Sequence, residues 1–130
     1  MLPLCREEGI GVIPWSPLAR GFVMGNRRRE DYGDTVRAKT DSYAHNLYYQ
    51  PSDFAVVERI GEVARKRGIS NAQVALAWLL GRPGITAPII GASKMAHLED
   101  AASAVGVRLD DEEIKKLEEC YQPHRVLGHS

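Results

Sequence analysis

The sequence has few cysteines, no excess of either charge and no long hydrophobic run, and each absence excludes a class of protein. Its 130 residues include only Cys5 and Cys120, without metal-type spacing. Two lone thiols predict a reduced, cytoplasmic chain without a metal site. Seventeen basic residues balance 17 acidic ones, which disfavours electrostatic binding to nucleic acid or membranes. No apolar stretch approaches the roughly 18 residues of a membrane span, and MLPLCREEG lacks the pattern of a signal peptide.

Two short apolar segments, residues 10–13 and 87–90, are typical of strands that are buried on both faces. Helical patterns lie around and between them, and such alternation predicts parallel βα units. The expected helices are the end of one over residues 2–8, stopped by Gly9; one from Phe54 to Gly68, capped by Ser52 or Asp53; one over 72–80, capped by Ser70 or Asn71; one over 95–104; and one over 109–120. A free-standing pair of strands is not a plausible sheet, so the chain is expected to be part of something larger.

The segment VIPWSPLARG, residues 12–21, places unusual groups where a strand ends. Pro14 and Pro17 interrupt regular pairing, because proline has no N–H to donate. An aromatic ring, a hydroxyl, a cation and a glycine also stand there: Trp15, Ser16, Arg20 and Gly21. On its own, the segment is more typical of a core tryptophan followed by a surface turn and a solvated arginine.

The second strand leaves as PIIGASKMAHLED, residues 88–100. Gly91 lets a ligand approach the backbone closely. Ser93 is expected at a helix N-cap, where free N–H groups favour an anion, and Lys94 adds a positive charge. His97 is expected one turn along, on the same side as Ser93. Alone, this pattern is more typical of a plain capped surface helix. Together, however, the two strand exits match the phosphate site that (β/α)₈ barrels often build after strands 7 and 8.

These two motifs, separated by the apolar helix AQVALAWLL, resemble the C-terminal part of an aldo-keto reductase. The resemblance covers nearly the whole chain and is weakest over residues 22–51. It implies an α/β fold, a partial TIM (β/α)₈ barrel in which residues 1–130 supply strands 7 and 8 as two parallel strands, with about five helices. Residues 22–51 are expected to form a long loop, either a lid or disordered.

The resemblance also implies an NADP(H) site, assigned here position by position. Trp15 would stack on the nicotinamide. Ser16, Leu18, Arg20 and Gly21 would line the pyrophosphate. The adenosine and its 2′-phosphate would meet Gly91, Ala92, Ser93, Lys94, His97 and, near the adenine, Asp100. Two positions depart from the family pattern: His97 stands where Gln or Arg is usual, and Ala101 where Asn is common.

The family's hydride transfer uses a tyrosine acid assisted by Lys, Asp and His, and no catalytic residue is assigned here because no such set has a matching context. Tyr43, Tyr48, Tyr49, Lys39 and His45 occur together in the expected loop but are not a substitute constellation. Met1 falls inside the helix before strand 7 of relatives. The chain is therefore expected to be roughly the last third of a reductase of aldehydes or ketones, inactive by itself.

Two alternatives remain open at this stage. The first is a non-enzymatic fragment or pseudoenzyme that binds a nucleotide weakly or assembles with a partner, for example a second copy through exposed barrel edges. The second is a helix-turn-helix DNA-binding regulator, suggested by VERIGEVARKRGISNAQVALAWLL, with RGIS as the turn. The near absence of polar residues in AQVALAWLL disfavours a recognition helix.

Overall fold

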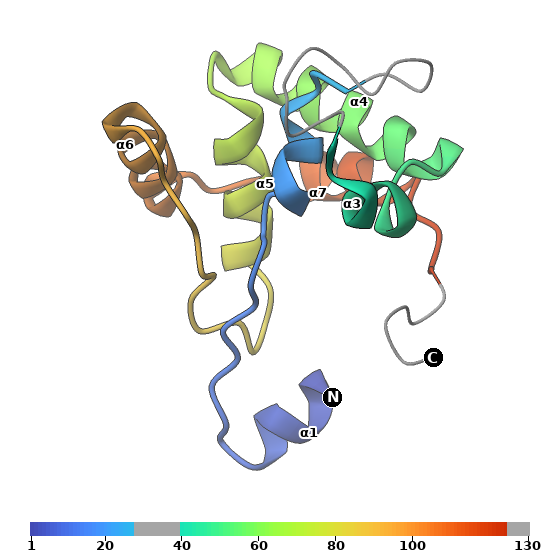
Figure 1. Ribbon diagram of the computed structural model, residues 1–130. Coiled ribbons are helices and arrows are strands. Elements are labelled where there is room, and N and C mark those ends of the chain that lie inside the picture. The colour runs from blue at the N-terminus through green and yellow to red at the C-terminus, as the bar shows by residue number, and fades with distance from the viewer. Residues whose placement is uncertain (28–39, 125–130) are drawn as a thin grey trace.

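Helices dominate the computed structural model, which describes residues 1–27 and 40–124 (Figure 1). The helical elements are α1 (Leu2–Glu7), η1 (Ala19–Met24), α3 (Ser42–Leu47), α4 (Pro51–Arg67), α5 (Asn71–Leu80), α6 (Met95–Ser103), η2 (Ala104–Gly106) and α7 (Asp111–Glu118). All five expected helices are present. Within residues 22–51, expected as a loop, the structure places the end of η1 and all of α3, whereas 28–39 lie outside the described residues. No described helix has the length and apolar character needed to cross a bilayer.

Local chemistry at the helix ends matches the sequence patterns at the end of α4 and the start of α5, but not at the start of α4. Gly68 ends α4 in a left-handed conformation, with φ of 66°. The Ser70 hydroxyl accepts a hydrogen bond from the Gln73 N–H at 3.1 Å, which caps α5 as predicted. The prediction that Ser52 or Asp53 caps α4 was wrong, because Pro51 starts the helix and Gln50 is the N-cap. Asp53 lies in the first turn instead, where its carboxylate accepts the Gln50 N–H at 2.9 Å.

The hydrophobic core lies between α4, α5 and α7. Its buried members are Ile60, Val63 and Ala64 of α4, Val74 of α5 and Leu117 of α7. Val74 is fully buried, which agrees with the nearly continuous apolar surface of AQVALAWLL. The three helices therefore share the core of the chain, and α1 projects away from them in Figure 1.

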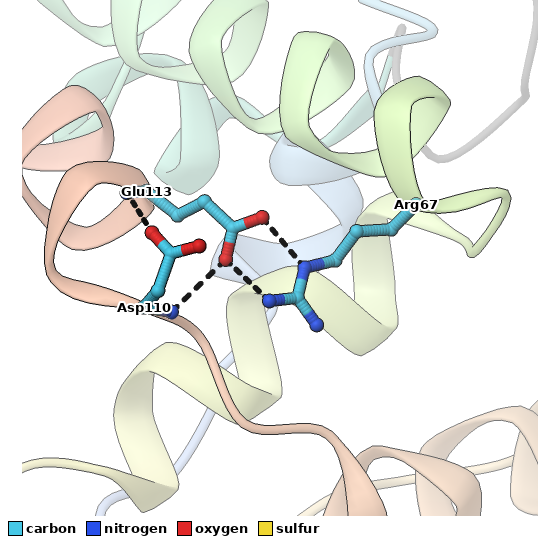
Figure 2. A network of polar contacts seen from close by, with 3 residues as sticks. All are labelled: Arg67, Asp110 and Glu113. Atoms are coloured by element: carbon cyan, nitrogen blue, oxygen red, sulfur yellow. Dashed lines mark hydrogen bonds and ion pairs between the residues drawn. The ribbon is translucent and has the colours of Figure 1, made fainter.

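A paired arginine and glutamate join two of these core helices (Figure 2). Arg67, the last residue of α4, donates from Nε to Glu113 Oε1 at 2.7 Å and from Nη2 to Oε2 at 2.5 Å. Asp110 and Glu113 also exchange hydrogen bonds in a capping box at the start of α7. The Glu113 side chain is 5% exposed, and its hydrogen bonds with Arg67 hold the pKa of this carboxyl below its ordinary value. One carboxylate thus fixes both the start of α7 and its contact with α4.

The two predicted strands are neighbours and parallel, but they form single bridges instead of a continuous ladder. Val12 pairs with Ile85 and Trp15 pairs with Ile89. The expectation of two strands buried on both faces was wrong for the described residues, since Ile10, Ile13 and Ile89 are 56%, 59% and 52% exposed. No third described strand lies beside the pair to extend the ladder or cover it.

The Glu113 geometry generates a stability prediction. Glu113→Gln keeps the shape but removes the charge, so it should lower the free energy of unfolding at pH 7 by about 1–3 kcal/mol. Because the folded-state pKa of Glu113 is lowered, the wild-type advantage is complete above the unfolded pKa of about 4.3 and disappears as pH falls through the lower folded value. Urea unfolding at pH 7 and at lower pH measures this. The control Glu112→Gln changes an exposed neighbour, and an equal loss in both variants would refute the role of the pair.

Candidate functional site

The parallel pairing places the two predicted motifs at the same edge of the structure. The Thr86 and Ile89 N–H groups donate to the carbonyls of Val12 and Pro14, each at 2.8 Å. The Val12 N–H donates to the Thr86 hydroxyl at 3.1 Å. Since the segments run in the same direction, the chain after Trp15 and the chain after Ile89 leave from neighbouring points. The structure therefore brings the starts of both motifs together.

Close contact between the segments depends on a glycine. A Cβ at Gly11 would lie 2.8 Å from the Thr86 hydroxyl oxygen, closer than real Cβ atoms approach. The hydroxyl would have to move, and with it the bond that it accepts from Val12. Neither Gly11 nor Thr86 was singled out by sequence reasoning. A threonine hydroxyl that replaces a ladder carbonyl leaves no distinct pattern in a sequence.

The first motif has a strained backbone where it leaves the strand. Ser16, Ala19 and Arg20 have positive φ values of 52°, 47° and 55°, and Gly21 follows at 89°. Left-handed non-glycine residues cost about 1–3 kcal/mol each and persist only where the surroundings fix them. Such strain often accompanies ligand-binding turns, and here it coincides with the segment predicted to line a pyrophosphate. Trp15, just before the turn, is 63% exposed.

Aromatic packing fixes the end of this turn. Phe22 is 4% exposed, and its ring centroid lies 4.9 Å from that of Tyr49 and 5.1 Å from that of Phe54. Tyr48 stacks on the same ring at 5.8 Å. Tyr48 and Tyr49, two tyrosines considered in the search for an acid, thus pack against η1. Lys39 and the side chain of Tyr43 lie outside what the structure describes.

An ion pair fixes the other side of the turn. Arg20 donates from Nε to Asp41 Oδ2 at 2.6 Å, and the Asp41 side chain is 8% exposed. The other carboxylate oxygen of Asp41 caps α3 by accepting the Ala44 N–H at 3.0 Å. Sequence reasoning missed Asp41, although an aspartate before a short helical segment is a recognised cap signal. What it could not show was that 21 residues of chain bring this carboxylate back to Arg20.

The second motif is open to solvent. Gly91, Ala92, Ser93, Lys94 and His97 are all exposed, and a Cβ at Gly91 would have nothing within 4 Å. The prediction that Ser93 is the N-cap of the following helix was wrong, because α6 starts at Met95 and Lys94 is its N-cap. The Lys94 side chain makes no cap hydrogen bond and no ion pair with the described residues. This lysine charge and the helix start remain available to an anion.

Asp100 has a protein partner that the sequence did not reveal. Its Oδ2 accepts a hydrogen bond from the Ser70 hydroxyl at 2.7 Å. The same hydroxyl caps α5, so Asp100 ties α6 to the start of α5. The Asp100 carboxylate, which is predicted to lie near an adenine, therefore also stabilises the contact between α6 and α5.

A cavity of about 390 Å³ lies away from both motifs, between the end of α5 and the segment from Val105 to Ile114. Its lining includes Trp78, Arg82 and Arg108, and none of the predicted site residues. The candidate site is thus an open edge formed by two loops, and it does not coincide with this cavity.

Comparisons with known proteins agree with the motifs. The model of the aldo/keto reductase family matches residues 1–122. The chain is 40% identical to the aldo-keto reductase dtxS3 of Metarhizium robertsii over 97% of its length and 33% of that protein's. It is also 40% identical to versiconal hemiacetal acetate reductase of Aspergillus parasiticus, over 97% of this chain and 36% of that one. The chain thus spans about a third of the length of these relatives.

A solved structure agrees on the fold. The thermostable aldo-keto reductase Tm1743, crystallised with the inhibitor epalrestat, superposes with a TM-score of 0.59 at 22% identity. The match covers 92% of this chain and 33% of that one. At this identity the likeness concerns the arrangement of the backbone.

The positive φ of Ala19 predicts how a glycine at this position changes the stability of the chain. Ala19→Gly should leave stability unchanged or raise it by up to about 1 kcal/mol, because glycine accepts a positive φ without the steric cost that alanine bears. The control is Ala96→Gly in the exposed first turn of α6, which should lose up to about 1 kcal/mol. Thermal unfolding compares the two variants. Equal losses would mean that Ala19 is not strained.

Proposed function

Because the chain belongs to the aldo/keto reductase family, we propose that it forms the C-terminal part of a (β/α)₈ barrel that reduces aldehydes or ketones with NADP(H). One observation carries the proposal: the Trp15–Ile89 bridge starts two loops, each suited to a phosphate, at neighbouring points of one edge. In barrels of this type, ligands bind at the carboxyl ends of the strands. The relatives named above are reductases, and members of the family generally use a nicotinamide cofactor.

The first loop fits the reactive half of such a cofactor. The exposed indole of Trp15 offers a flat apolar face on which a nicotinamide ring could stack. Ser16, Leu18, Arg20 and Gly21 follow in a turn of fixed, strained shape. We assign these residues to the pyrophosphate, which needs close approach to the backbone and a positive charge. When bound, NADPH supplies a hydride.

The second loop fits the adenosine half. Open space beside Gly91 allows a ligand to approach the backbone together with Ala92 and Ser93. Lys94 stands at the start of α6, where its charge and the helix N–H groups act on the same anion. We assign this place to a 2′-phosphate, with His97 and Asp100 one and two turns further along α6.

The exposed faces of Ile10, Ile13 and Ile89 are where further strands of a barrel would pack. We propose that the remaining βα units found in full-length relatives cover these side chains, and that a second copy of the chain covers them when those units are absent. A carbonyl substrate would bind only where that cover completes the barrel.

A second candidate, a nucleotide-binding chain without catalysis, is favoured by two observations. Tyr48 and Tyr49 pack against Phe22, and no Tyr, Lys, Asp and His set of the family pattern was found in the sequence. Hydride transfer builds charge on the carbonyl oxygen, and a positioned acid must meet that charge. A DNA-binding role has less support, because Val74 and Leu76 of the would-be recognition helix are buried.

Lys94→Ala tests the cofactor assignment. The substitution should weaken NADPH binding by about tenfold to a hundredfold, which corresponds to roughly 1–3 kcal/mol for a charge-assisted contact. NADH binding should hardly change, because NADH lacks the 2′-phosphate. Calorimetric titration of each cofactor measures both constants, and Lys115→Ala, which removes an exposed lysine from α7, is the control. Equal losses for NADPH and NADH would assign Lys94 to the fold or to the pyrophosphate.

A steady-state assay tests whether the 130-residue chain can reduce a carbonyl compound by itself. The 130-residue chain with NADPH should not reduce a reactive aldehyde such as 4-nitrobenzaldehyde, because general acid help worth about 10²–10⁴ in rate is missing. NADPH absorbance follows the reaction. Turnover that scales with protein, and that Trp15→Ala or Lys94→Ala abolishes, would reveal an acid within this chain.

A further inference from the structure

Asp41 occupies a central place beside the candidate cofactor loop. It is nearly buried, with 8% of its side chain exposed, and its two oxygens serve two different segments. Oδ1 accepts the Ala44 N–H and starts α3, whereas Oδ2 accepts the Arg20 Nε–H at 2.6 Å. A single carboxylate thus couples the geometry of α3 to that of the strained turn.

Arg20 is held from two directions. Its guanidinium is bound by Asp41, and its backbone carbonyl accepts a hydrogen bond from Arg27 Nη2 at 3.2 Å. Between these contacts the backbone of Arg20 has a φ of 55°, a conformation that favours glycine. Fixed contacts on either side of Arg20 offset this strain. Of the two hydrogen bonds, the charge-assisted bond to Asp41 is shorter than the bond from Arg27.

The far end of the turn, beyond Gly21, is held by contacts that do not involve Asp41. Phe22 packs against Tyr49 and Phe54, and Asn71 donates to the carbonyl of Val23 at 3.0 Å. These contacts fix η1 beyond Gly21. The polar pair with Asp41 therefore acts mainly on the residues nearest to the strand end, which are those assigned to the pyrophosphate.

We propose that Asp41 is a positioning residue, which holds Arg20 and the left-handed turn in the shape that a dinucleotide pyrophosphate requires. The proposal rests on the function proposed above. A carboxylate beside a phosphate-binding arginine can also act in the opposite sense, by neutralising the arginine and weakening its hold on the anion. The two roles predict opposite changes in NADPH affinity when the charge of Asp41 is removed: weaker binding if Asp41 positions Arg20, and tighter binding if it neutralises Arg20.

The first experiment is a titration of the 130-residue chain with NADPH. Asp41→Asn should weaken binding by about tenfold, the scale of one charge-assisted hydrogen bond. Asp111→Asn removes an equal charge from an exposed position in the first turn of α7 and should bind as the wild type does. Unchanged or tighter NADPH binding by Asp41→Asn would overturn the proposal.

The second experiment uses no cofactor and separates this inference from the proposed function. The N–H groups of Ala19 and Gly21 bond to the carbonyls of Ser16 and Leu18 at 2.9 and 2.8 Å. In Asp41→Asn their hydrogen exchange should accelerate by about tenfold or more, while core amides such as that of Val74 keep their wild-type rates. Unchanged exchange at Ala19 and Gly21 would overturn the positioning role. If the wild type binds no NADPH, the proposed function fails, and the exchange rates alone decide whether Asp41 shapes the turn.

Discussion

The parallel pairing of residues 12–15 with residues 85–89 is the constraint on which the candidate site depends. Two backbone hydrogen bonds and one to the Thr86 hydroxyl set its register, and Gly11 leaves room for that hydroxyl. A slip by one residue would turn alternate side chains to the opposite face. It would also separate Trp15 from Ile89, and with them the starts of the two loops that the site combines.

The helical body holds this pairing in place. Val74 of α5 shares the hydrophobic core with α4 and α7, and the Arg67–Glu113 pair joins α4 to α7. At the end of α5, Glu118 of α7 accepts hydrogen bonds from Trp78 at 2.8 Å and from Arg82 at 2.9 Å. Ile85 follows three residues after Arg82 and is already paired with Val12. Only a few residues therefore separate the contacts of Arg82 with α7 from the start of the second loop, so the helical core determines where this loop lies.

The sequence predicted those features that local chemistry decides. The apolar surface of α5, the Ser70 cap and the left-handed Gly68 follow from residue types within one or two turns, and the parallel neighbours follow from the βα order. Features that depend on distant residues were not predictable. Ile13 and Ile89 are as apolar as buried strand residues, and only the absence of a covering strand among the described residues exposes them. The Asp41–Arg20 and Asp100–Ser70 contacts join residues 21 and 30 positions apart, and no periodic pattern indicates them.

The central claim is that a nicotinamide cofactor binds at the edge where Trp15 ends its strand. The chain has two tryptophans, so Trp78→Phe leaves Trp15 as the sole indole and Trp15→Phe leaves Trp78. The most direct measurement is the quenching of tryptophan emission as NADPH is added to each variant, with free N-acetyltryptophanamide as the control for absorbed light. The account predicts saturable, strong quenching in Trp78→Phe and much weaker quenching in Trp15→Phe. Saturable quenching seen only in Trp15→Phe, where Trp78 is the remaining indole, would contradict it. So would a decrease of Trp15 emission in Trp78→Phe that is no larger than the decrease of the free N-acetyltryptophanamide control.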